Sequence, residues 1–595
     1  MINAFRRYRC FVPDSEDLAT IKYREARIYY ESNHYEEAAV LFRDIALNNT
    51  DSDLAEYAAN LYLDSLNVMG AMREPHRLSC ILEIKDNIEP LFAAYCSTAE
   101  KLADHETLCG TLQQLRCDVL RKEAEGLQEQ QNYKRAASTY VRIFRRFQEC
   151  GRLDEVLYNA ALNFEAAHLL GRAIQVRKVL ITRYADSEWA KRAVYLVGAN
   201  FHALAFYEQA ADYYEQFARR FPGEDGHGCT DAEREGGTCA IASEALQNAV
   251  FFRLGLNQPD KAEADVALFA RNYKRSLPRQ TSEVVFALGS IYERAESWSR
   301  VIEHYNRYLR DYRRTAMPHQ LISANLKIAM AYWSLDRKDD AKRFFEAAAH
   351  AWEGTPEAIN ALDGTQGEKV AWLREAVDST AQSLFYLAEY KFAEFQTIHF
   401  PRYSGGRSLD RVNQWAQTEF MAWIQAKQTA LQATETEYNK VAALRVPVTD
   451  AVTLESPPWQ IAAAARIGQM YISIIDAVQD APVPEEIEAD PELYDIYVDA
   501  FDGPLEPVRV QAISKFEFCL RTATNVRWFN EYSTICESEL NRLNPRQYPV
   551  AAELRGAPSY MNAPLGDPGA VELSTGDDED TEPATDAASP AGGAS

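Results

Sequence analysis

Residues 198–222 read GANFHALAFYEQAADYYEQFARRFP. A small residue, Gly198, is followed twelve positions later by a second small residue, Ala210. Aromatic residues lie at helical spacing from each of them, Phe201 after the first and Tyr214 after the second. Two antiparallel helices approach closely only where both present small side chains, so this stretch predicts a tightly crossed helix pair.

The same spacing recurs between residues 21 and 352. In six units, two residues stand twelve positions apart. Both are Gly or Ala in five units, and valine is the second residue in the other. These units are Ala26/Ala38, Ala124/Ala136, Ala161/Ala173, Gly198/Ala210, Gly289/Val301 and Ala329/Ala341. One helix pair cannot bury its apolar face alone, so a fixed period favours a stack of pairs over an irregular bundle.

This pattern resembles the tetratricopeptide (TPR) signature. The resemblance implies an all-α solenoid, a right-handed superhelix of helix pairs, that binds other proteins. The endings RRFPG at 219–223 and TRYADS at 182–187 are similar to those of TPR units in bacterial envelope proteins. Residues 54–120 keep a helical pattern without a clear frame, and we interpret them as degenerate repeats.

The composition changes along the chain and predicts five regions. The last region is rich in Pro, Gly, Ala, Ser, Thr and acidic residues, which cannot bury apolar surface, so we expect it to be disordered. The predicted regions are a lead-in (1–20), the TPR-like array (21–352) with a cysteine loop (223–240), long helices forming an arm (353–457), a helical C-terminal module (458–549) and an acidic tail (550–595).

The C-terminal module contains the run Arg466-Ile-Gly-Gln-Met-Tyr and a helical stretch at 507–523. It resembles the C-terminal part of large TPR proteins from myxobacteria and related deltaproteobacteria. That group includes components of the adventurous gliding-motility machinery. The resemblance implies a periplasmic protein that belongs to an envelope complex.

The charge balance argues against two classes of partner. The chain carries 63 basic and 88 acidic residues, a net charge of −25, which would repel nucleic acid and anionic membranes. No apolar run approaches the length of a membrane span, since even 467–475 is short and is followed by Asp476, so no membrane insertion is expected. No signal-peptide pattern follows Met1, so either the protein is cytoplasmic or an upstream segment is missing.

Ten cysteines are present, and none forms a Cys-x-x-Cys motif. Zinc ribbons and thioredoxin-type sites are therefore not expected. Cys519 and Cys536 fall on successive predicted helices and are candidates for a disulfide. Disulfides would imply an oxidising compartment.

A second pair, Cys229 and Cys239, brackets a polar, Gly-rich loop. A disulfide is the first interpretation of this pair, and two reduced thiols are the second. A metal site with His227 and Asp231 is the third, because Cys, His and Asp are common metal ligands.

No catalytic motif is visible. The sequence lacks a P-loop, a His-Glu-x-x-His helix and a Gly-x-Ser-x-Gly elbow. We therefore expect no enzyme activity and no cofactor.

A groove for partners is expected where the first helices of the pairs line one face of the array. In the repeat frame, five residues fall on this face. A groove lined by these residues would suit an extended peptide or a partner helix. The alternative is that they pack between repeats. They are Tyr158, Tyr195, His202, Phe286 and Trp333.

The sequence thus predicts a protein-interaction scaffold in a bacterial envelope assembly, periplasmic, with gliding motility or surface biogenesis as the specific hypothesis. The alternative is a cytoplasmic TPR adaptor or regulator, which reduced cysteines would favour.

Overall fold

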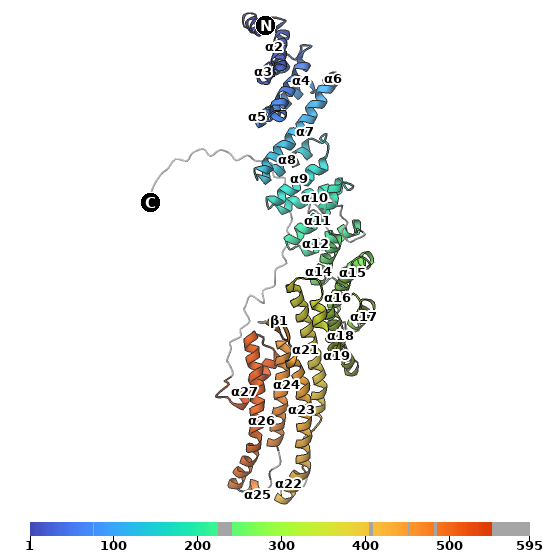
Figure 1. Cartoon of the computed structure of the whole chain (residues 1–595), viewed down its shortest axis with the longest axis vertical. Helices are drawn as coiled ribbons and strands as arrows, with labels where there is room; N and C mark the ends of the chain where they lie inside the picture. Colours follow the sequence, from blue (N-terminus) through green and yellow to red (C-terminus); the bar gives the residue numbers. More distant parts are fainter. Residues whose placement is uncertain are drawn as a thin grey trace, which may run out of the picture. The chain divides into compact units, whose positions relative to one another are not determined.

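A computed structural model describes residues 1–74, 77–223, 241–403, 408–449, 452–480, 483 and 485–549. The predicted tail (550–595) and most of the cysteine loop, with Cys229, Cys239, His227 and Asp231, lie outside the described residues. The chain divides into two compact units, and each is considered by itself (Figure 1). Among the described residues, unit 1 covers 1–221 and unit 2 covers 222–549.

Unit 1 consists of helices joined by short turns. They are α1 (Ile2–Phe11), α2 (Leu18–Glu31), α3 (Tyr35–Asn48), α4 (Ala55–Asn67), the π-helix η1 (Val68–Met72), α5 (Leu78–Tyr95), α6 (Ala99–Asp104), α7 (Glu106–Glu129), α8 (Tyr133–Arg146), α9 (Leu153–Ala166), α10 (Leu170–Arg183), α11 (Glu188–Ala203) and α12 (Tyr207–Arg220).

Unit 2 begins with further helix pairs and continues into longer helices. Its elements are α14 (Ala242–Gly255), α15 (Pro259–Tyr273), α16 (Pro278–Arg294), α17 (Trp298–Asp311), α18 (Pro318–Ser334), α19 (Lys338–Ala351), α20 (Thr355–Asn360), α21 (Gln366–Gln396), α22 (Leu409–Trp415), the π-helix η2 (Ala416–Phe420), α23 (Met421–Ala443), β1 (Val446–Thr449), β2 (Val452–Leu454), α24 (Pro457–Gln479), α25 (Glu485–Glu488), α26 (Pro491–Val526) and α27 (Glu531–Leu543).

From α7 to α12 the helices of unit 1 pack in chain order, each against the next, whereas α5 packs against α7 (Figure 1). The small residues predicted at the crossings are buried: Ala161 and Ala173 have no exposed surface, and a Cβ at Gly198 would come within 2.8 Å of Tyr214 Cδ1. Apolar cores follow one another along the unit, the first from α2 to α7 and the next from α7 to α11. The predicted fold class, an all-α TPR-like solenoid, is confirmed.

The turn inside each pair repeats one backbone geometry. A residue with positive φ lies seven positions after the first small residue, and the next residue donates its backbone N–H to a carbonyl in the last turn of the first helix. In the first pair His34 N donates to Tyr29 O at 2.8 Å. This bond closes the helix as in a Schellman motif. The positive-φ residues are Asn33, Gln131, His168, Ala205, Asn257, Glu296 and Asp336.

The pair formed by α14 and α15 belongs to the same series, although its sequence frame is degenerate. Val250 replaces the small residue on α14, is fully buried and stands twelve positions before the equally buried Ala262. The turn residue Asn257 has a φ of 56°, as in the other pairs. The repeat frame was not recognisable here in the sequence, because Val250 is branched where the other units have Gly or Ala.

The long helices α21, α23, α24 and α26 pack side by side (Figure 1). We call the part of unit 2 from α21 to α27 the long-helix module. Helical structure runs continuously from α22 through η2 to the end of α23, and η2 inserts one π turn. Between α23 and α24 a short antiparallel hairpin pairs Val446 with Leu454 and Thr449 with Val452. It is the one sheet in the described part of the chain, and the sequence pattern did not predict it.

By length and composition, α24 is apolar enough to cross a membrane, contrary to the expectation that no apolar run is long enough. However, 61% of its most apolar window is buried inside the structure. Ile461 and Met470 on this helix are fully buried against neighbouring helices. The apolar character of α24 is therefore explained by its position in the core of the long-helix module.

His304 on α17 makes the array sensitive to acid. Burial lowers the pKa of His304 to about 4, and its Nε2 lies 3.0 Å from the backbone oxygen of Val285. The unfolded chain binds the proton more tightly, so this contribution is complete above about pH 6.5 and is lost as pH falls towards 4. We expect the free energy of unfolding to be lower by about 2 kcal/mol near pH 5 than near pH 7.5.

Urea unfolding across this pH range measures the effect, with His304→Gln as the comparison. Glutamine keeps an amide donor for Val285 and does not titrate, so the variant should lose less stability on acidification. Parallel pH profiles for the two proteins would contradict the assignment.

Candidate functional site

The first helices of neighbouring pairs contact one another, α9 with α11 in unit 1 and α14 with α16 in unit 2. We call the side of each unit made by these helices and α18 the first-helix face. It is the face on which the sequence frame placed the candidate groove.

Two apolar side chains on this face are exposed. Leu162 on α9 directly follows the crossing residue Ala161 and is 37% exposed. Phe251 on α14 directly follows Val250 and is 42% exposed. They occupy the same position of the repeat in different units. Neither residue was among the predicted groove residues, which lie at other positions of the repeat, although the same frame identifies both.

Hydrogen bonds connect successive first helices in unit 1. Asn163 Nδ2 donates to Gln128 Oε1 at 2.9 Å, which joins α9 to α7. Asn200 Nδ2 donates to Glu165 Oε1 at 3.0 Å, which joins α11 to α9. The fully buried guanidinium of Arg177 donates to both Glu165 and Asn200. Glu165 remains about one-third exposed, so a carboxylate lies near Leu162 on the surface of α9.

Unit 2 carries a similar set of polar contacts. Gln280 Nε2 donates to Gln247, which joins α16 to α14. Lys327 Nζ on α18 lies 2.6 Å from Glu293 Oε2 on α16, and the buried Tyr305 hydroxyl donates to the other oxygen of Glu293 at 2.6 Å. These contacts set the spacing of the first helices and line their face with amide and charged groups.

The candidate groove residues of unit 1 have different environments. Tyr158 is buried, and its ring lies 4.5 Å from that of Trp189, so it is not accessible to a partner. Tyr195 is partly buried against Tyr214, with 5.6 Å between ring centroids. His202 is exposed and lies 6.4 Å from the same Tyr214 ring. Tyr195 and His202 thus lie near the same ring, that of Tyr214, whereas Tyr158 packs on Trp189.

In unit 2, Phe286 and Trp333 are partly buried. The ring of Phe286 lies 5.4 Å from that of Tyr305, its partner across the helix pair. Trp333 packs on Tyr386 of α21 with 5.0 Å between centroids. Both side chains therefore pack against neighbouring rings while part of each remains exposed to solvent.

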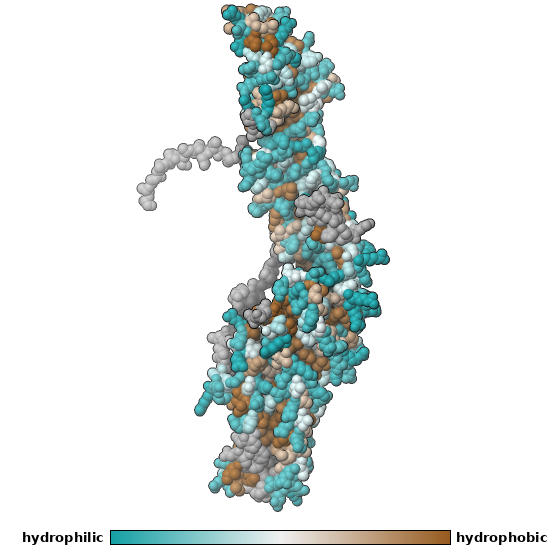
Figure 2. Space-filling view, viewed as in Figure 1, coloured by the Kyte–Doolittle hydropathy of each residue, from teal (hydrophilic) through white to brown (hydrophobic). Residues whose placement is uncertain are grey.

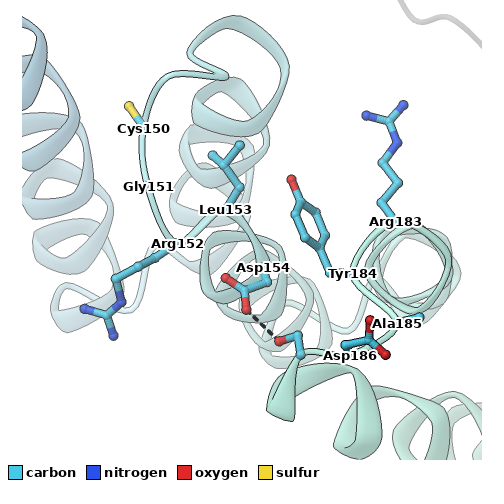
Figure 3. A pocket seen from close by; sticks show the side chains of 10 residues that line it. Cys150, Gly151, Arg152, Leu153, Asp154, Arg183, Tyr184, Ala185 and Asp186 are labelled. Atoms are coloured by element: carbon cyan, nitrogen blue, oxygen red, sulfur yellow. Dashed lines mark hydrogen bonds between the residues drawn. The ribbon is translucent and has the colours of Figure 1, made fainter.

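A cavity of about 560 Å³ lies at the edge of unit 1, between the α8–α9 and α10–α11 turns (Figure 3). Asp154 accepts a hydrogen bond from the Ser187 hydroxyl at 2.6 Å, and the Tyr184 ring stands beside them (Figure 3). Carboxylates and guanidinium groups mix in this lining, which suits a polar side chain of a partner. The lining residues are Cys150, Gly151, Arg152, Leu153, Asp154, Arg183, Tyr184, Ala185, Asp186 and Ser187.

Three disulfides connect described residues. Cys519 and Cys536 are joined between α26 and α27. Two further pairs were not predicted from the sequence, and both lie in the degenerate part of the array or beside it. They are Cys96–Cys109 and Cys117–Cys150.

The missed disulfides depend on the path of the chain. Cys117 is in the middle of α7 and Cys150 follows α8, so the disulfide links α7 to the segment that leaves α8. Their Cα atoms are 5.6 Å apart, a distance that the 33-residue separation in sequence does not reveal. Cys10 is an exposed free thiol and Cys80 a buried one.

No protein-family model and no curated protein matches the chain. Among solved structures it is similar to the TPR domain of P58(IPK), with 14% identity, 60% of this chain and 92% of that chain covered, and a TM-score of 0.19. A Rap protein complexed with competence and sporulation factor shows 9% identity, 72% and 98% coverage, and a TM-score of 0.21.

The structure of Naa15/Naa10 bound to HypK-THB shows 12% identity, 93% and 90% coverage, and a TM-score of 0.18. At TM-scores this low, whole-chain superposition carries no argument. The TPR-like fold rests on the helix pairs themselves.

Proposed function

We propose that this chain is a non-catalytic scaffold that holds segments of other proteins against its first-helix face. The observation that carries the proposal is the exposure of Leu162 and Phe251 at one repeat position, beside amide and carboxylate groups. An apolar side chain flanked by hydrogen-bonding groups suits an extended peptide or a helix of a partner.

Site-specific photo-crosslinking in the native cells tests this function. A photoreactive amino acid at Leu162 or Phe251 should give discrete adducts with other proteins. The matched control is Val40, an exposed apolar residue on the second helix α3. Adducts of equal yield at all three positions, or at Val40 alone, would contradict the assignment of the first-helix face.

We further propose that the scaffold works in the periplasm of a bacterial envelope. The three disulfides support this location, because such bonds persist in oxidising compartments. Alkylation of the native protein without reductant, followed by mass spectrometry, should leave these six cysteines unlabelled and modify the exposed Cys10. Labelling of all six would favour the alternative, a cytoplasmic TPR adaptor or regulator.

The more specific role, in gliding motility or surface biogenesis, is supported by the resemblance of the C-terminal module to myxobacterial TPR proteins. Deletion of the gene should impair gliding or the assembly of surface structures, and complementation should restore it. Normal gliding and a normal cell surface in the deletion strain would contradict this role.

A further inference from the structure

The first turns of α26 extend past its packing partner. Gly468 on α24 faces the ring of Phe516 on α26. The two helices run antiparallel (Figure 1). Counting along both helices from this contact places the end of α24, Gln479, at the level of Leu505. Leu505 is buried, whereas the described side chains before it on α26 are exposed.

Four of these exposed side chains are large and apolar. Leu493, Tyr494, Ile496 and Val498 are 45%, 41%, 60% and 40% exposed. Figure 2 shows apolar surface at this end of the long-helix module. Single exposed apolar residues are ordinary on protein surfaces, but four within six positions of one helix form a patch.

The patch lies in a strongly acidic part of the chain. No Lys, Arg or His occurs from 480 to 506. Asp490 caps the helix by accepting from the backbone N–H groups of Glu492 and Leu493 at 3.0 and 3.4 Å. The acidic residues of this stretch are Asp480, Glu485, Glu486, Glu488, Asp490, Glu492, Asp495, Asp499, Asp502 and Glu506.

Helical spacing separates charge from apolar surface on these turns. Glu492 and Asp495 are three positions apart and share one side of α26, while Leu493 and Ile496 share the adjacent side. Neither Glu492 nor Asp495 forms an ion pair within the described part of the chain. Both carboxylates therefore remain available to a cation on a partner. We call the segment Asp490–Val498 the acidic tip.

We propose that the acidic tip docks a basic amphipathic helix of another protein. Leucine-type side chains of the partner would cover Leu493 and Ile496, and its Lys or Arg residues would pair with Glu492 and Asp495. The charge of the segment repels anionic membranes, so a protein fits better than a lipid surface. This surface is separate from the first-helix face, and its assignment does not depend on the proposed function.

Fluorescence anisotropy with the full chain tests the proposal. The probe is a labelled peptide of leucine and lysine, about four helical turns long, with leucines at i, i+3 and i+4. We expect the double substitution Leu493→Ser and Ile496→Ser to weaken binding by about tenfold. Asp495→Lys should weaken it by about fivefold and reduce its salt dependence.

Matched substitutions elsewhere distinguish binding at the acidic tip from general attraction of the probe to the negative charge of the chain. Val40→Ser removes an exposed apolar residue on α3, and Glu346→Lys reverses an exposed charge on α19. Both should change binding by less than about twofold. Equal weakening by Glu346→Lys and Asp495→Lys, or equal binding of a peptide with scrambled leucines, would overturn the proposal.

The same variants test two other possible occupants of the acidic tip, a second copy of this chain and a membrane. The proposal is also overturned if the probe does not bind the wild-type chain. It is overturned as well if the tip substitutions instead abolish self-association in sedimentation or binding to neutral phosphatidylcholine vesicles, since the occupant would then be a second copy or a membrane.

Discussion

Replacing Glu389 by alanine is expected to lower the free energy of unfolding of the long-helix module by about 3 kcal/mol. Glu389 on α21 accepts from Arg466 on α24, with Nε at 3.0 Å and Nη2 at 3.2 Å, and from the hydroxyl of Tyr438 on α23. Tyr438 is fully buried and the ion pair is largely buried. Removing the carboxylate leaves a cation and a hydroxyl without their partner in the core.

Urea unfolding followed by circular dichroism measures this loss, and Glu394→Ala provides the control. Glu394 lies on the same helix and pairs with Lys391 at 2.8 Å, but both groups are exposed, so the midpoint should stay close to wild type. Adding Arg466→Leu to a Glu389→Leu variant should recover part of the stability, because no buried charge then remains unpaired. Additive losses in the double variant would contradict the coupling.

Replacing Gly289 by alanine is expected to destabilise the array by about 2–3 kcal/mol. A Cβ at this position would overlap the end of the Tyr305 ring. That ring is fully buried, its hydroxyl donates to Glu293 at 2.6 Å, and His304 lies 5.1 Å from it. Tyr305 therefore cannot move away without losing contacts, and the better helix propensity of alanine offsets only about 1 kcal/mol.

Gly126→Ala is the matched control. Gly126 lies inside α7, and no atom lies within 4 Å of a Cβ built on it. Alanine there should raise the stability by about 0.5–1 kcal/mol through helix propensity alone. A stabilising effect of alanine at both glycines, measured by urea unfolding, would show that the crossing at Gly289 is looser than the structure has it.

In the long-helix module, the local sequence pattern predicts the helices but not the features that depend on packing. Helical structure runs from Leu409 to Ala443, inside the region (353–457) for which the sequence predicts long helices. The π turn η2 and the hairpin that follows leave no comparable signal, because they depend on how α23 and α24 pack together. The apolar character of α24, a helix long enough to span a membrane, is likewise explained only by the neighbouring helices that bury it.

The spacing of small residues was enough to predict a series of crossed helix pairs over residues 21–352. The Gly or Ala residues at most crossings act within one pair, over fewer than about forty residues, so their spacing is visible in the sequence. Which residues are accessible and which are bonded follows only from the packing of helices against one another. Tyr158 is hidden because Trp189 of the next pair covers it, while Leu162 on the same helix stays exposed. Cys117 meets Cys150 only when α7 and α8 pack. Such contacts depend on neighbours in other helices, which periodicity along one helix does not specify.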